Sequence, residues 1–146
     1  MRRVAIIGAG SVVFCKTLIL DIMATEVLEE TEFVLMAPST TKTTHVKSYI
    51  DRVIAQNNLK ARVSITTDRR EALAGANYVI CSFQIGGLTA FELDYKIPLK
   101  YGVDQCIGDT LGPGGVFRAL RSIPVILDVA RDMEELCPKA ILLNYV

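Results

Sequence analysis

The chain has 146 residues, of which 51% are hydrophobic and 22% are charged, and its formal net charge at pH 7 is zero. This length suits one globular domain that buries about two thirds of its unfolded surface, and the composition excludes an extensively disordered protein. The balanced charge, with no basic stripe, argues against a nucleic-acid-binding protein. The apolar runs are too short to span a membrane, and the chain opens directly into a predicted strand, so we expect a cytoplasmic protein.

The four cysteines, Cys15, Cys81, Cys106 and Cys137, are widely separated, and His45 is the only histidine. A zinc site or a disulfide framework needs closely spaced cysteines or more histidines. We therefore expect four reduced thiols, several of them small core residues, and no metal site within the chain.

A strand, a tight turn and a helix are predicted at the amino terminus. Residues 4–7 are apolar and run into Gly8, and apolar residues recur at helical spacing from Ser11 onward. Gly8 lets the chain turn, and Gly10, which has no Cβ, lets the backbone approach a pyrophosphate bound to the N–H groups of the helix. Val13 replaces the third glycine of the dinucleotide-binding fingerprint, and we expect its side chain to crowd the packing of helix against strand. A strand-to-helix turn without a ligand is the alternative interpretation.

The end of the second predicted strand, residues 32–36, departs from the usual dinucleotide-binding pattern. Ala37 stands where an aspartate or glutamate normally accepts hydrogen bonds from the adenosine ribose. Four threonines, one serine and one lysine follow in residues 38–44. One interpretation is that these hydroxyls and Lys42 bind the 2′-phosphate of NADP. The other is a threonine-rich helix start behind a weakened NAD site.

Helices and strands alternate through the middle of the chain. A helix is predicted over residues 44–58 and strands over residues 62–66 and 77–83. Asp68 is predicted to open a short helix that ends before Gly75, with two solvated arginines, Arg69 and Arg70, at its start.

The last third of the chain is predicted to hold a long irregular loop, a long helix and a final strand. Residues 94–115 are expected to be irregular and functional, because four glycines lie between positions 108 and 115. The helix covers residues 116–136 and is expected to bend at Pro124, and the strand covers residues 140–143. The alternation predicts an α/β fold, a Rossmann-type parallel sheet of about five or six strands with flanking helices.

Two arginines near the start of the long helix have two possible roles. Arg118 and Arg121 could bind an anion, or they could form structural ion pairs with Asp104 or Asp109. We favour the ion pairs.

The cofactor-binding residues are expected beyond the carboxyl ends of the strands. Ser82, Phe83 and Gln84 belong beside the ribose and nicotinamide half, and Asn144 falls at the nicotinamide end. The complete predicted set is Gly8, Gly10, Ser11, Val12, Val13, Phe14, Ala37, Ser39, Thr40, Thr41, Lys42, Ser82, Phe83, Gln84 and Asn144.

Five sequence segments together resemble glycoside hydrolase family 4, above all its α-galactosidase and α-glucosidase members. They are residues 8–11 (GAGS), 84–87 (QIGG), 97–102 (IPLKYG), 108–118 (GDTLGPGGVFR) and 143–146 (LNYV). The resemblance implies that residues 1–146 form the NAD-binding, amino-terminal part of a two-domain enzyme, whose substrate and metal domain is absent from this sequence.

The resemblance also implies an unusual hydrolysis of O-glycosidic bonds. NAD oxidises the C3 hydroxyl of the sugar, a base removes the C2 proton, the glycoside is eliminated, water adds, and the hydride returns. A divalent metal, usually Mn²⁺, polarises the sugar oxygens. Asp109 is similar to the residue that supports the catalytic tyrosine of the family. That tyrosine and the metal ligands follow the segment that resembles residues 143–146, so we expect this chain alone to bind NAD or NADP but to be inactive as a hydrolase.

Two other functions are considered. A hydroxyacid dehydrogenase would need a histidine base and a substrate arginine in a second domain, and residues 108–115 do not match its loop. A non-enzymatic nucleotide-binding scaffold is the other alternative, with apolar surface within residues 85–107 favouring a homo-oligomer.

Overall fold

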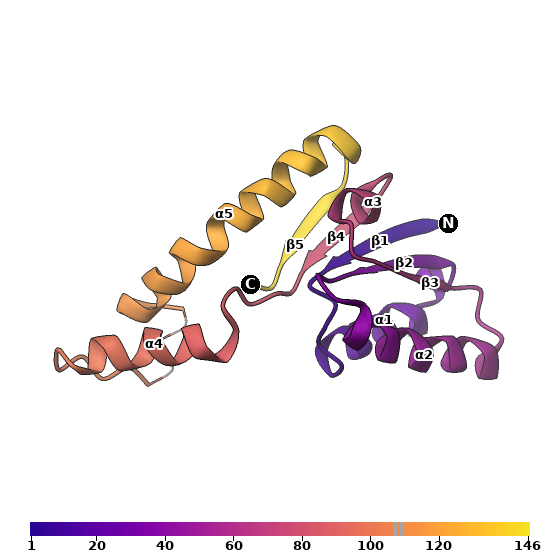
Figure 1. Ribbon diagram of the computed structural model, residues 1–146. Coiled ribbons are helices and arrows are strands. Elements are labelled where there is room, and N and C mark those ends of the chain that lie inside the picture. Colours follow the sequence, from indigo (N-terminus) through magenta and orange to yellow (C-terminus); the bar gives the residue numbers. More distant parts are fainter. Residues whose placement is uncertain (107, 109) are drawn as a thin grey trace. The chain divides into compact units, whose positions relative to one another are not determined.

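The computed structural model describes residues 1–106, 108 and 110–146, and its centre is a parallel β-sheet (Figure 1). The strands are β1 (Arg2–Ile7), β2 (Thr31–Met36), β3 (Arg62–Thr66), β4 (Tyr78–Cys81) and β5 (Ile141–Asn144). The helices are α1 (Phe14–Ala24), α2 (Thr40–Asn57), α3 (Arg69–Leu73), α4 (Gly87–Leu99) and α5 (Gly112–Leu136), with a 3₁₀ turn, η1 (Glu26–Leu28). No helix among the described residues is long and apolar enough to cross a membrane.

Two compact units divide the chain. The first contains residues 1–83 and 130–146, and therefore the whole sheet with α1, α2 and α3. The second contains residues 84–129, and therefore α4 and most of α5.

The sheet has the strand order β3-β2-β1-β4-β5, and all of its strands are parallel. The chain moves outward from β1 through β2 to β3 and then returns to the other side of β1 with β4. This reversal confirms the predicted Rossmann-type α/β sheet. Ligands of such sheets bind beyond the carboxyl ends of the strands at the reversal, here those of β1 and β4.

The core of the sheet unit explains why residues 4–7 form a central strand. Val4 and Ile6 are buried in a cluster with Ile19 of α1, Phe33 of β2 and Ile50 of α2. The intervening residues of β1 are buried as well, as expected for a strand covered on both faces. Figure 1 shows α1 and α2 together on one face of the sheet and α3 on the other.

Helix boundaries differ from the predicted ones at three places. Helix α1 ends at Ala24 and not near residues 27–28, which lie in or beside η1. Helix α2 begins four residues early, at Thr40, because Ser39 caps it. Helix α5 begins at Gly112 and not at residue 116, with Pro113 in its first turn, where no backbone N–H is needed.

The predicted irregular loop is wrong for residues 94–99, which form the end of α4. Pro98 removes one backbone hydrogen bond from the last turn of α4. Its missing N–H would have bonded the Asp94 carbonyl, and the Gln105 side-chain amide donates to that carbonyl instead, at 3.3 Å.

Helix α3 is capped as predicted, but its arginines are not simply solvated. The Asp68 carboxylate accepts the N–H groups of Arg70 and Glu71 at 2.8 and 3.4 Å. Arg69 and Arg70 both donate to the Asp132 carboxylate of α5, at 2.6 and 2.5 Å. Burial raises the pKa of Asp132, but the hydrogen bonds and charges of the two arginines outweigh it, so the pKa lies below its usual value.

Within the second unit, Arg121 forms an ion pair whose partner differs from the predicted ones. Its guanidinium donates two hydrogen bonds, at 2.7 and 2.5 Å, to the carboxylate of Asp94. Asp94 is 3% exposed, and the sequence analysis assigned it no role. The pair links α4 to α5 and fills the donor capacity that an anion would need.

Candidate dinucleotide site

The turn after β1 is anchored to the two neighbouring strands. The N–H groups of Gly8 and Ala9 both donate to the Met36 carbonyl at the end of β2, at 2.9 and 3.0 Å. Gly8 has φ +90°, and a methyl group on it would lie 2.4 Å from the Ser82 carbonyl oxygen just after β4. Only glycine fits this position, because both the backbone angle and the close approach exclude a side chain.

The fold does not require a glycine at position 10. Its φ is not in the left-handed region, and a methyl group on it would make only ordinary contacts, 3.8 Å from Cδ and 4.0 Å from Cβ of Lys42. The missing side chain therefore has no role in packing the protein, and it leaves room for a ligand beside the backbone.

Unpaired backbone donors follow Gly10. The Ser11 hydroxyl accepts the N–H of Phe14 at 3.1 Å, and the Ser11 carbonyl accepts that of Cys15 at 3.1 Å. Among the described residues, the N–H groups of Ser11, Val12 and Val13 find no acceptor. Such free N–H groups at a helix start are the donors that a pyrophosphate binds.

The expectation that Val13 would crowd the packing of helix and strand is wrong. Its side chain is 74% exposed, because α1 begins only at Phe14 and Val13 precedes it. Ala9 is the residue of the turn that is fully buried.

The segment after β2 lies beside the glycine turn. Ala37 is 7% exposed, and its N–H donates to the Thr66 carbonyl at 3.4 Å. Ser39 caps α2 by accepting the Thr41 N–H at 3.4 Å, so the threonine-rich segment does start a helix. Lys42 lies in the first turn of α2, with its stem beside Gly10.

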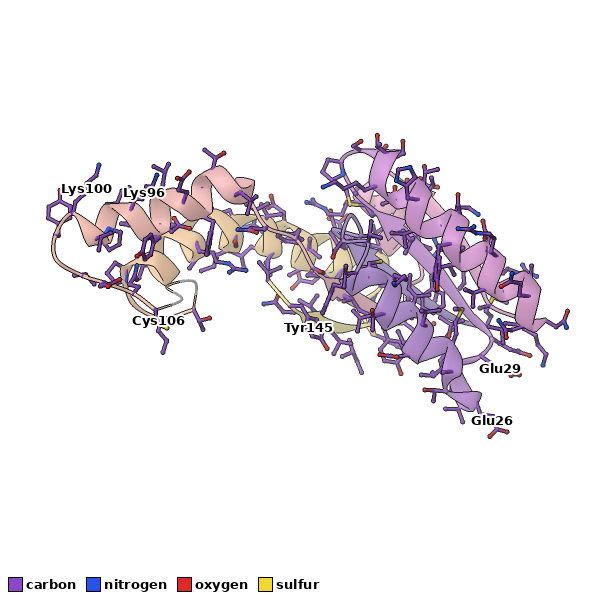
Figure 2. All side chains as sticks on the ribbon, turned by 90° about the horizontal axis from the view of Figure 1, so that it is seen from below. Glu26, Glu29, Lys96, Lys100, Cys106 and Tyr145 are labelled. Carbon is purple, nitrogen blue, oxygen red and sulfur yellow. The ribbon has the colours of Figure 1, made fainter. Side chains whose placement is uncertain are left out.

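The ends of β4 and β5 lie side by side at the same edge of the sheet. Ser82 donates its N–H to the Ile7 carbonyl at 2.8 Å, and Asn144 pairs with Cys81 in register. Phe14 packs edge-on against Tyr145, with ring centroids 5.2 Å apart, and the exposed Tyr145 is labelled in Figure 2. The sequence analysis missed this contact. An aromatic residue directly after the last strand, Tyr145, was the feature of the sequence that could have indicated it.

The structure thus brings most of the predicted cofactor residues to one edge of the sheet unit. They are Gly8, Gly10, Ser11, Val12, Val13, Phe14, Ala37, Ser39, Thr40, Thr41, Lys42, Ser82, Phe83 and Asn144. Gln84 is the first residue of the second unit, and Asp109 lies outside the described residues.

Three of the four cysteines are core residues, as predicted, and all four are free thiols. Burial raises the pKa of Cys15 to about 12 and that of Cys81 to about 11, and it also raises the pKa of Cys137. These thiols therefore stay protonated near neutral pH. In the part of the chain that the structure describes, no three His, Cys, Asp or Glu side chains could together hold a metal ion.

Comparison with known proteins gives one family. The sequence model described as "Family 4 glycosyl hydrolase" matches residues 3–146. An α-galactosidase of Rhizobium meliloti is 49% identical over 98% of this chain and 29% of its own length. An α-galactosidase of Bacillus subtilis is 40% identical over 99% of this chain and 34% of its own length. The chain thus spans about a third of the length of these relatives.

Solved structures share the fold. A 6-phospho-β-glucosidase of Thermotoga maritima, solved with manganese, NAD⁺ and glucose-6-phosphate, has a TM-score of 0.84 and 28% identity over 100% of this chain and 34% of its own. A lactate dehydrogenase of Cryptosporidium parvum has a TM-score of 0.61 at 18% identity over 98% of this chain and 36% of its own, a likeness of fold alone. With a family match over nearly every residue and close relatives among the α-galactosidases, the chain belongs to glycosyl hydrolase family 4.

Proposed function

We propose that this chain binds a nicotinamide dinucleotide at the glycine turn, as part of a family 4 glycosidase. The observation that carries the proposal is a glycine that the fold itself does not require, Gly10, followed by the free N–H groups of Ser11, Val12 and Val13. These groups fit a pyrophosphate, because they supply donors and a close backbone approach without a charged side chain.

Each part of the edge has its own role in this proposal. The glycine turn and the start of α1 bind the pyrophosphate, and the segment from Ala37 to Lys42 faces the adenosine ribose. Ser82, Phe83 and Asn144 lie toward the nicotinamide. When bound, the nicotinamide supplies reversible hydride transfer with the substrate. The residues of this chain orient it by holding its pyrophosphate and adenosine half.

For the whole enzyme we propose hydrolysis of an α-galactoside or α-glucoside with NAD or NADP and Mn²⁺. The support is the identity to α-galactosidases and to an α-glucosidase of Erwinia rhapontici, which is 38% identical over 98% of this chain. The metal is assigned to residues beyond those described here, since none of the described ones form a suitable group.

Isothermal titration calorimetry of the purified chain with NAD and with NADP tests the binding proposal. We expect saturable binding of at least one of them and a clear loss of affinity for Gly10→Ala, whose methyl group takes the space needed by the pyrophosphate. Ser48→Ala, on the exposed surface of α2, is the matched control and should bind normally. No heat with either dinucleotide would contradict the proposal.

We also propose that these 146 residues do not hydrolyse glycosides by themselves. The support is the resemblance, which assigns the metal ligands and the catalytic tyrosine of the family to other segments. A nitrophenyl α-galactoside assay with NAD and Mn²⁺ checks this, and cofactor-dependent release of nitrophenol would contradict it.

Self-association is proposed for the second unit. Large apolar side chains are exposed on α4 and α5, among them Leu88, Leu93, Leu120 and Ile123. Their burial between two copies would remove apolar surface from water. Sedimentation velocity over a range of concentrations should show a dimer, and Leu120→Ser should weaken it; a monomer at every concentration would contradict this.

A further inference from the structure

The residue that normally distinguishes the two nicotinamide dinucleotides is absent from the site. Ala37 directly follows Met36, whose carbonyl binds the glycine turn, so position 37 lies at the adenosine side of that turn. A carboxylate there would accept hydrogen bonds from the ribose 2′-hydroxyl and repel a 2′-phosphate. Ala37, a residue that is 7% exposed, carries only a methyl group and does neither.

A cation lies beside the glycine turn. The stem of Lys42 runs beside Gly10, and among the described residues its ammonium forms no ion pair or hydrogen bond. The first turn of α2 contains no acidic residue that could neutralise it. The charge is therefore available to an anion bound at the glycine turn.

Two hydroxyls accompany the cation. Ser39 and Thr41 are exposed, and their oxygens lie 3.3 Å apart. Capping uses a lone pair of the Ser39 oxygen and not its proton, because the Thr41 N–H is the donor. The helix cap and phosphate recognition are therefore compatible, and one hydroxyl proton remains for a phosphate oxygen even if the two hydroxyls bond each other.

We propose that the site selects NADP over NAD, with Lys42, Ser39 and Thr41 binding the 2′-phosphate and Ala37 placing no carboxylate beside it. This inference rests on the proposed function, since it concerns the same dinucleotide site. The family resemblance by itself implies NAD, and Ala37 and Lys42 are what separate this chain from that expectation.

Calorimetry with NADP and NAD, at about 0.05 M and about 0.5 M NaCl, tests the selection. We expect NADP to bind at least about tenfold more tightly at low salt, and the ratio to fall at high salt because the added contact is ionic. Adenosine 2′,5′-bisphosphate should exceed adenosine 5′-phosphate in the same way, which isolates the added phosphate.

Three variants locate the effect. Lys42→Gln should weaken NADP binding about five- to tenfold and leave NAD binding unchanged. Ala37→Asp should reverse the preference, and its retained NAD binding shows that it folds. Lys139→Gln removes an exposed lysine just before β5, at the opposite edge of the sheet, and should change neither affinity.

The outcomes separate this inference from the proposed function. NAD binding as tight as NADP binding would overturn the selection and leave dinucleotide binding intact. Binding of neither would overturn the proposed function. Tighter NADP binding that Lys42→Gln leaves unchanged would overturn the assignment of the phosphate to Lys42.

Discussion

At the scale of single residues, glycine occupies positions 8 and 10 of the turn for different physical reasons. Gly8 is required by the protein itself, since a side chain would meet the Ser82 carbonyl in a left-handed backbone conformation. Gly10 has neither constraint. The sequence pattern treats them alike, whereas the structure requires a glycine only at position 8, which is why we assign the proposed binding role to Gly10.

Substituting Gly8 by alanine should therefore reduce mainly stability, and substituting Gly10 by alanine should reduce mainly dinucleotide binding. Gly8→Ala should lower the free energy of unfolding by about 3 kcal/mol or more, because the new methyl group forces the turn away from the Ser82 carbonyl just after β4. Gly10→Ala should change it by less than about 1 kcal/mol while weakening dinucleotide binding. Urea unfolding followed by circular dichroism measures the first effect and calorimetry the second. Equal destabilisation by both would contradict the distinction.

At the scale of elements, ion pairs with two buried carboxylates attach α5 to its neighbours inside the two units. Asp132 of α5 pairs with Arg69 and Arg70 of α3, and Arg121 of α5 pairs with Asp94 of α4. Both carboxylates are largely buried, whereas Arg69, Arg70 and Arg121 remain partly exposed. Partial exposure moderates the energetic value of each pair.

Asp132→Asn should lower stability by about 1–2 kcal/mol at neutral pH. Because the folded pKa of Asp132 is depressed, its contribution is present above the unfolded pKa of about 4 and is lost as pH falls through the folded value. Urea unfolding at several pH values should show the variant and the parent converging below about pH 4. Glu135→Gln, which removes only an exposed pair with Arg70, should cost less than about 0.5 kcal/mol. A difference between variant and parent that is independent of pH would contradict the role of the charge.

Asp94→Asn should destabilise the second unit by about 2–3 kcal/mol, because it leaves the Arg121 guanidinium partly buried without its counter-charge. Hydrogen exchange of α4 and α5 measures the loss. Glu92→Gln removes an exposed pair with Lys96 and is the matched control. Comparable exchange in the two variants would show that Asp94 contributes no more than a surface charge.

A structural feature could be predicted from the sequence when the interactions that cause it lie within a few residues of one another. The strand at residues 62–66 and the Asp68 cap were predicted correctly, because hydrophobic pattern and capping act over a few residues. The end of α4 was not, since Pro98 reads as a helix breaker until Gln105 is seen to replace its lost hydrogen bond. Asp94 was overlooked because its partner lies 27 residues away.

At the scale of the whole molecule, the proposed binding residues belong almost entirely to the sheet unit, while the exposed apolar side chains of α4 and α5 belong to the other. A dinucleotide at about a hundred times its Kd should stabilise the protein by about 2.7 kcal/mol. We expect hydrogen exchange to slow in residues 8–14 and 37–42 and to stay unchanged in residues 88–99. Protection confined to residues 88–99 would contradict the assigned site.

The distribution of the thiols allows chemical labelling to follow the opening of the sheet unit. Cys106 is exposed in the second unit (Figure 2), whereas Cys15, Cys81 and Cys137 are enclosed in the sheet unit. An alkylating reagent should attach one label to the native chain at once, and three more only as the sheet unit opens. The slow labels therefore time the exposure of the sheet, and the fast one places a dye in the other unit without any substitution.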